Sequence, residues 1–121
     1  MARAVLATMT KYLISFPSSA MDLALDEWQA AGDAAHAVLD EMRAAGVYVF
    51  GGGIDESVAP VLVTGDGEAA EGTYPQTAQL DGGMTVIEVE TRADAVKWAA
   101  KIAVACRCTQ ELRAFQYDPL A

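Results

Sequence analysis

The order of apolar segments along the chain constrains its fold more than any other sequence feature. Short apolar runs typical of strands occupy residues 11–16, 47–50, 58–64 and 84–90, with a return strand at 69–74 and a last strand at 111–116. Helical patterns lie after the first run and after the 84–90 run. The resulting order is β-α-β, a hairpin insert, then β-α-β. It predicts one α+β domain of the ferredoxin-like type over residues 10–121.

The first helical pattern covers residues 22–45 and ends at Gly46, which is a typical stop signal. Its apolar residues recur at alternating spacings of three and four, so they form one stripe. The second helix begins with Thr91 and Asp94, the residues of a capping box. The expected inward residues are Leu25, Trp28, Gly32, Ala35, Leu39 and Met42 in the first helix, and Ala95, Trp98, Ala99 and Ile102 in the second.

The strands are near-continuous apolar runs rather than clean alternations, as in Val47-Tyr48-Val49-Phe50. Such runs indicate burial on both faces of a sheet. Two helices cover only one face, so a partner is needed for the other. A second copy of the chain is the simplest partner, which predicts a homodimer packed sheet to sheet.

Charge and composition exclude several classes of function. The formal net charge is −9, which repels phosphate backbones and argues against nucleic-acid binding. No apolar run approaches the roughly 18–20 residues of a membrane span, and residues 1–9 are expected to be a flexible leader rather than a secretory signal. Cys106 and Cys108 are too close for an unstrained disulfide. We expect structural thiols, with a redox or metal role as the alternative, in a cytoplasmic protein without metal or cofactor.

A Gly- and turn-rich segment at residues 71–83, called the signature segment below, leads into the strand that starts at Met84. It resembles the signature of the YCII-related proteins, also called the DGPF-domain family, in which an Asp-Gly-Pro-Phe turn precedes a Gly-Gly pair. The resemblance extends over residues 11–117. Glu71, Thr73 and Tyr74 stand where the family usually has Asp, Pro and Phe, whereas Thr77, Gly82 and Gly83 match it directly.

The resemblance implies a dimeric α+β barrel and a chemistry that is poorly defined. Some relatives are associated with sigma-factor-type regulators, and one catalyses dehydrochlorination of an aromatic ring. A His–Asp pair has been suggested to act in related members. By resemblance, His36 corresponds to this histidine and Asp55 to this aspartate.

His36 is the sole histidine of the chain, so any imidazole acid–base step must use it. It projects roughly 70° from the centre of the expected stripe, at an edge from which a side chain can reach a cleft. The alternative is a rim histidine without a function. Asp55 follows Gly51, Gly52 and Gly53, a glycine turn that would let a ligand approach the main chain. Asp55 would orient His36, or it is a solvated loop acid.

Tyr74 and Glu71 flank the signature turn. Tyr74 would donate a hydrogen bond to a substrate and Glu71 would bind a ligand, or both are structural. Arg107 and Arg113 would pair either with an anionic ligand or with acids of the chain. The sequence thus predicts a small-molecule-binding homodimer with His36-dependent elimination or isomerisation chemistry. The alternative is a non-catalytic regulatory or interaction module.

Overall fold

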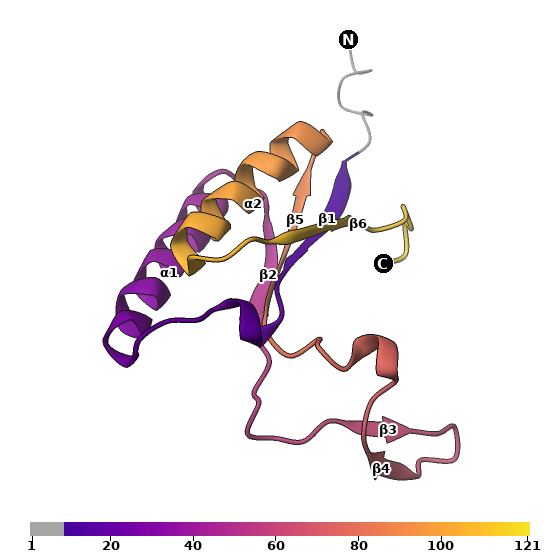
Figure 1. Cartoon of the computed structure of the whole chain (residues 1–121). Coiled ribbons are helices and arrows are strands. Elements are labelled where there is room, and N and C mark those ends of the chain that lie inside the picture. The colour runs from indigo at the N-terminus through magenta and orange to yellow at the C-terminus, as the bar shows by residue number, and fades with distance from the viewer. Residues whose placement is uncertain (1–8) are drawn as a thin grey trace.

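The computed structural model describes residues 9–121 and shows an α+β fold. Strand β1 leads through two short 3-10 turns to helix α1, and helix α2 precedes the last strand (Figure 1). The elements are β1 (Thr10–Ser15), α1 (Trp28–Ala44), β2 (Tyr48–Gly53), β3 (Val61–Val63), β4 (Ala69–Glu71), β5 (Gly83–Val89), α2 (Arg92–Cys106) and β6 (Glu111–Ala114).

Four strands form the main sheet in the order β2-β5-β1-β6, and every neighbouring pair is antiparallel. This order is compatible with the ferredoxin-like plan expected from the sequence. Both helices pack on the same face of the sheet (Figure 1). The opposite face, called the free face below, has no helix against it in the described part of the chain.

The core lies between the sheet and the two helices. Alternate residues of β1 and β5 point into it, because successive side chains of a strand face opposite sides. Tyr12 and Ile14 of β1 and Ile87 and Val89 of β5 are buried there. The helices contribute Val38, Met42, Ala95, Ala99, Ile102, Ala105 and Cys106.

Local signals at the helix ends act as the sequence predicts. Gly46 adopts a φ of 74°, and its amide donates to the Arg43 carbonyl at the end of α1. At the start of α2, the Asp94 amide donates to Thr91 Oγ1 at 3.1 Å. The inward residues expected for α2 are confirmed, with Trp98 partly buried and the other three buried.

The predicted stripe of α1 is wrong in its first half. Residues Leu25–Glu27 form a 3-10 turn before the helix, so the helical period does not extend through them. Leu25 is 94% exposed and Trp28 is 43% exposed. In the second half, Met42 is buried and Ala35 and Leu39 pack against the core, as predicted. Ala31 and Val38, which the predicted stripe did not include, are also buried, so the inward face of α1 is turned relative to the prediction.

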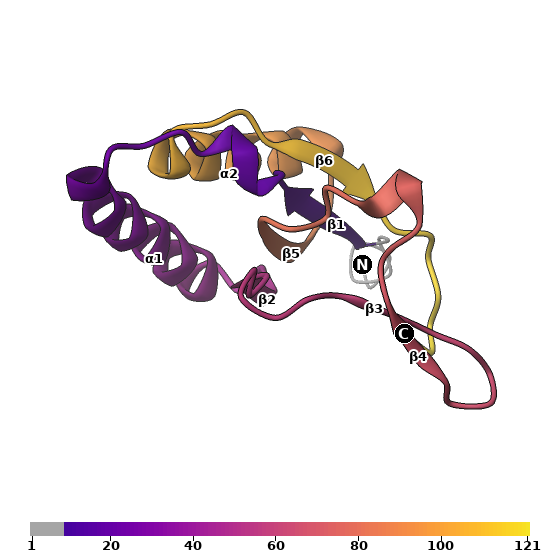
Figure 2. The same ribbon diagram turned by 60° about the horizontal axis from the view of Figure 1, so that its bottom comes forward.

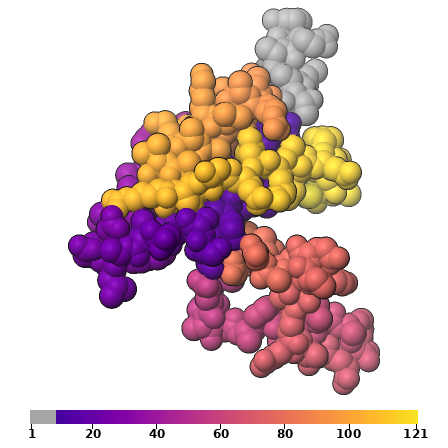
Figure 3. Space-filling view, viewed as in Figure 1, coloured from indigo at the N-terminus to yellow at the C-terminus, as the bar shows by residue number. Residues whose placement is uncertain are grey.

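Residues 54–82, called the insert below, connect β2 to β5 and carry the hairpin β3–β4. The predicted turn Gly65-Asp66-Gly67 is confirmed, because the Thr64 amide donates to the Glu68 carbonyl and Gly67 has a φ of 90°. The hairpin projects from the body as a separate lobe (Figures 2 and 3). Its strands are exposed throughout, so the burial on both faces expected for β3 is not found within one chain.

The predicted glycine turn is also wrong. Gly51, Gly52 and Gly53 are the second half of β2 and pair with Thr85, Met84 and Gly83 of β5. None of the three has a positive φ. Strand pairing with β5 therefore continues through the glycines, and the chain turns away only after Gly53.

Most of the predicted leader, residues 1–8, lies outside the described residues. Within the described part, neither helix is long and apolar enough to cross a membrane.

Candidate functional site

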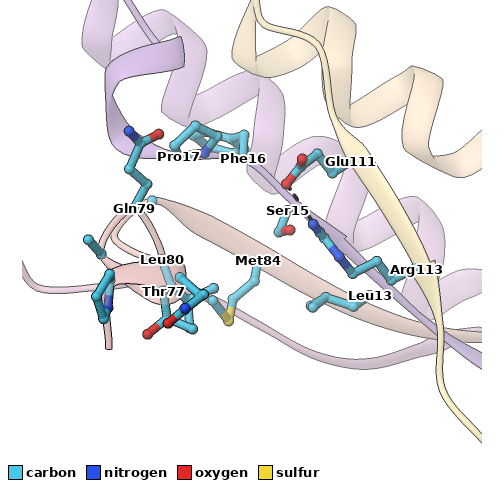
Figure 4. Close-up of a pocket in the computed structure, with 14 residues that line it drawn as sticks. Leu13, Ser15, Phe16, Pro17, Thr77, Gln79, Leu80, Met84, Glu111 and Arg113 are labelled. Atoms are coloured by element: carbon cyan, nitrogen blue, oxygen red, sulfur yellow. Dashed lines mark hydrogen bonds and ion pairs between the residues drawn. The ribbon is translucent and has the colours of Figure 1, made fainter. Parts of the chain in front are cut away.

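A hollow in the described part of the chain lies on the free face, where the sheet meets the signature segment. Its volume is about 620 Å³, within the usual range of small-molecule sites. The insert forms one wall, and β1, β5 and β6 form the floor (Figure 4). Its lining residues from the insert are Pro75, Gln76, Thr77, Ala78, Gln79, Leu80 and Gly82; those from the sheet and the turn after β1 are Leu13, Ser15, Phe16, Pro17, Met84, Glu111 and Arg113.

The end of the signature segment fastens the wall of this cavity to the sheet. The Asp81 carboxylate accepts hydrogen bonds from the Ser18 amide and the Ser18 hydroxyl, both at 2.9 Å. Both hydrogen bonds stabilise the charged carboxylate and so lower the pKa of Asp81, and the bond from the Ser18 amide has the larger effect. The Gly82 carbonyl accepts from the Ile54 amide at 2.9 Å, which joins the two ends of the insert. The Gly83 carbonyl accepts from the Phe16 amide at 3.2 Å.

Steric contact explains why two glycines follow Asp81. A Cβ atom at Gly82 would lie 2.0 Å from the Phe16 carbonyl oxygen, and one at Gly83 would lie 2.7 Å from the Phe16 ring. Real Cβ atoms do not approach other atoms so closely. The Gly82-Gly83 pair is therefore needed where the insert crosses the end of β1.

Two charged residues line the cavity, and both come from β6. Arg113 Nη1 and Glu111 Oε1 are 3.1 Å apart, and each side chain is 59% exposed (Figure 4). Ser15 lies opposite Glu111 in the register of β1 and β6 and is buried. The site thus combines an ion pair and a hydroxyl group with a wall of mixed polar and apolar side chains.

His36 lies outside this cavity. It is exposed on α1, and the buried residues Ala31, Val38 and Met42 define the inward face of that helix. The inward direction of α1 is the mean direction of these three residues and of Ala35, which packs against the core. Because each residue turns the helix by about 100°, His36 points about 130° away from that direction. The expectation that His36 reaches a cleft from the edge of the stripe fails for this reason.

Asp55 and the three glycines do not line the cavity either. Asp55 Oδ1 accepts from the Ser57 hydroxyl at 2.6 Å and from the Ser57 amide at 3.0 Å, and these bonds lower its pKa. Its hydrogen-bond partner is therefore Ser57 rather than His36. Among the glycines, only Gly51 is closely packed, since a Cβ there would lie 3.1 Å from the Tyr48 hydroxyl.

Tyr74 and Glu71 border the wall of the cavity without lining it. Tyr74 precedes the 3-10 turn Pro75–Thr77 and is 69% exposed, and its carbonyl accepts from the Thr77 amide at 3.1 Å. Glu71 is exposed and pairs with Val61 in the hairpin. The ligand-binding roles expected for Tyr74 and Glu71 stay predictions.

The remaining candidates separate into structural and site residues. Arg107 pairs with Glu27 at 3.0 Å, away from the cavity, whereas Arg113 lies in it. Cys106 and Cys108 are free thiols, and burial raises the pKa of both. No group of three or more His, Cys, Asp or Glu side chains that could hold a metal ion is found in residues 9–121.

Glu111 lines the cavity but was not predicted as a site residue. The sequence did contain a signal for this pair. Glu111 and Arg113 are two residues apart in an expected strand, so their side chains must lie on the same face of the sheet. What the sequence could not supply was the position of β6 beside β1.

Comparison with protein families shows which family the chain resembles. A family model described as YCII-related domain matches residues 10–111, which is most of the chain. The matched region includes β1, both helices, the insert and the first residue of β6. No curated protein matches the chain.

Proposed function

The chain belongs to the YCII-related domain family, and on this basis we propose that it is a homodimer that binds a small molecule in the free-face cavity. The observation that carries the proposal is a hollow of about 620 Å³ whose wall is the signature segment. Polar and apolar side chains converge there, as they do in ligand sites.

The free face supports the dimer part of the proposal. One residue from each strand lies in a single row across this face, because the register pairs them as neighbours. The row runs from Phe50 through Val86 and Leu13 to Arg113, so three apolar residues lie side by side. Phe50 is 60% exposed in the single chain. A sheet face of this kind is stabilised when it is covered, and the same face of a second copy provides a matching surface. We therefore propose the dimeric α+β barrel arrangement.

The dimer is tested by sedimentation equilibrium at micromolar concentration. Val86→Lys places a charge in the centre of the row and should give monomers. Val96→Lys is the matched control, because Val96 is exposed on α2, on the other side of the sheet. A monomeric wild type, or equal association of both variants, would contradict the sheet-to-sheet dimer.

The ligand is sought by a thermal-shift screen of metabolites. Leu80 lines the cavity and is 54% exposed, so Leu80→Trp should narrow the cavity without disturbing the core. Leu25→Trp, at the exposed 3-10 turn, is the control. A compound that stabilises the wild type and Leu25→Trp but not Leu80→Trp supports the site. Failure of every compound to stabilise the wild type counts against it.

Acid–base chemistry through His36 is the less favoured form of this proposal. Glu111 is the sole carboxylic acid among the residues that line the cavity, so a proton transfer there would use Glu111 rather than His36. His36→Ala should therefore leave ligand affinity unchanged. A tenfold loss of affinity in this variant would restore the histidine to the site.

We also propose that the protein acts in the cytoplasm, where a reducing environment suits the free thiols of Cys106 and Cys108.

A second candidate function is a protein-interaction module, which the exposed hairpin favours. Val61 is 51% exposed and Val63 is 66% exposed on a lobe that projects from the body (Figure 3). A two-stranded hairpin is marginally stable alone, so a partner would stabilise it. If Val63→Lys changes neither the oligomeric state nor ligand binding, the hairpin is not needed for the preferred function.

A further inference from the structure

The ion pair in the cavity indicates which class of ligand it accepts. Glu111 and Arg113 are two residues apart on β6, so both side chains lie on the free face. They are the only charged residues that line this cavity, and their charges are opposite. The cavity therefore presents a positive and a negative group, 3.1 Å apart, with no net charge.

This pair can be opened at small cost. Each of its side chains is 59% exposed in the single chain, and ion pairs so exposed to water contribute at most about 1 kcal/mol to stability. A ligand that brings both charges replaces one weak pair with two new pairs. A ligand with a single charge would bind one side chain and leave the other without a partner.

The charge of the rest of the chain disfavours a simple anion. The insert that forms the cavity wall contains six acidic residues and no Lys, Arg or His, and the whole chain has a net charge of −9. An anionic ligand would be repelled during its approach, whereas a zwitterion has no net charge and is not.

The rest of the cavity lining is mixed, because the insert contributes the polar side chains of Gln76, Thr77 and Gln79 next to apolar ones. The larger apolar side chains that line the cavity are Leu13, Phe16, Pro17, Pro75, Leu80 and Met84. On the insert side, Figure 4 shows Leu80 together with Thr77 and Gln79, across from the ion pair of β6. A ligand with adjacent opposite charges at one end and an apolar group at the other would match both parts.

From this geometry we propose that the cavity binds a free α-amino acid with an apolar side chain. Arg113 binds the carboxylate and Glu111 binds the ammonium group. The apolar lining residues Leu13, Leu80 and Met84 contact the side chain of the ligand. In a free α-amino acid both charges are attached to the same carbon, which suits two protein groups that are themselves in contact. This inference rests on the proposed function, because it names the ligand class of the same cavity.

The inference is tested by calorimetric titration of the whole protein with L-phenylalanine and L-leucine. N-acetyl-phenylalanine, which lacks the positive charge, and phenylalanine amide, which lacks the negative charge, are the matched ligands. We expect saturable binding of the free amino acids and binding about tenfold weaker, or more, for both blocked forms.

Variants assign the two contacts. Arg113→Met should lower the affinity for phenylalanine and for its N-acetyl form, because both contain the carboxylate. Glu111→Gln should lower the affinity for phenylalanine and for its amide. Arg107→Met is the control, since it removes an exposed ion pair with Glu27 outside the cavity and should change affinity less than twofold.

The outcomes separate this inference from the proposed function. Equal affinity for phenylalanine and its N-acetyl form, or unchanged affinity in both cavity variants, overturns the amino-acid assignment. If neither amino acid binds but a screened compound stabilises the wild type and not Leu80→Trp, the assignment is wrong and the small-molecule site stands. If no compound of any class binds, both proposals fail.

Discussion

Gly82→Ala tests the structural role of the signature segment most directly. The added Cβ would lie 2.0 Å from the Phe16 carbonyl oxygen and 2.8 Å from the Pro17 carbonyl carbon and the Ser18 nitrogen. These are main-chain atoms, so no side-chain rotation relieves the contact. The chain must move by about an ångström, and the hydrogen bonds from Ile54 to Gly82 and from Phe16 to Gly83 are then strained or broken.

The expected cost follows from these contacts. Overpacking costs about 1–3 kcal/mol, and each weakened hydrogen bond adds about 1 kcal/mol. The free energy of unfolding should therefore fall by about 3–5 kcal/mol. For a domain of this size that lowers the melting temperature by about 10–20 °C.

Urea and thermal unfolding followed by circular dichroism measure this change. Gly53→Ala is the matched control, because Gly53 lies in β2, lacks a positive φ, and has room for a Cβ with no heavy atom within 4 Å. It should change the free energy of unfolding by less than about 1 kcal/mol. Stability of Gly82→Ala within about 1 kcal/mol of the wild type would refute the close approach to β1.

Three further predictions concern other parts of the fold. Met42→Ala should cost about 2–5 kcal/mol in urea unfolding, whereas Leu25→Ala should stay within about 0.5 kcal/mol; equal losses would contradict the inward face described for α1. The hydrogen bonds from Ser18 keep the pKa of Asp81 in the folded state below its value in the unfolded chain. The stabilisation that they give is therefore present above about pH 4 and is lost as the pH falls through the folded-state pKa. The stability difference between wild type and Asp81→Asn should accordingly shrink on acidification, and a constant difference would contradict this. Burial raises the pKa of Cys106, so its reaction with a thiol reagent near neutral pH should be at least about tenfold slower than that of glutathione, and equal rates would show that the thiol is accessible.

Local sequence signals predicted the local parts of the fold. Gly46, Gly67 and Thr91 determine a helix end, a hairpin turn and a helix start through their own backbone or side-chain bonds. The inward face of α1 was predicted less well, because the 3-10 turn Leu25–Glu27 interrupts the period on which the stripe was drawn. Alanines such as Ala31 gave no strong apolar signal, although Ala31 is buried.

The candidate site was harder to predict, because it depends on which strands are neighbours. Its residues come from the end of β1, the insert and β6, which are far apart in the sequence. Only the pairing of β6 with β1 brings Glu111 next to Ser15. The sequence drew attention to His36 because it is the sole histidine, yet that argument concerns residue type and contains no information on position.

The signature segment illustrates why a recognisable sequence pattern need not contain the reactive groups of a site. Asp81 bonds to Ser18, and the Gly82-Gly83 pair allows the insert to cross the end of β1. These residues hold the wall of the cavity in place, while the charged groups that face the cavity come from β6. A substitution of Asp81, Gly82 or Gly83 should therefore lower stability and ligand affinity together. A substitution of Glu111 should lower affinity without lowering stability, because its side chain is exposed and its ion pair with Arg113 contributes little to folding.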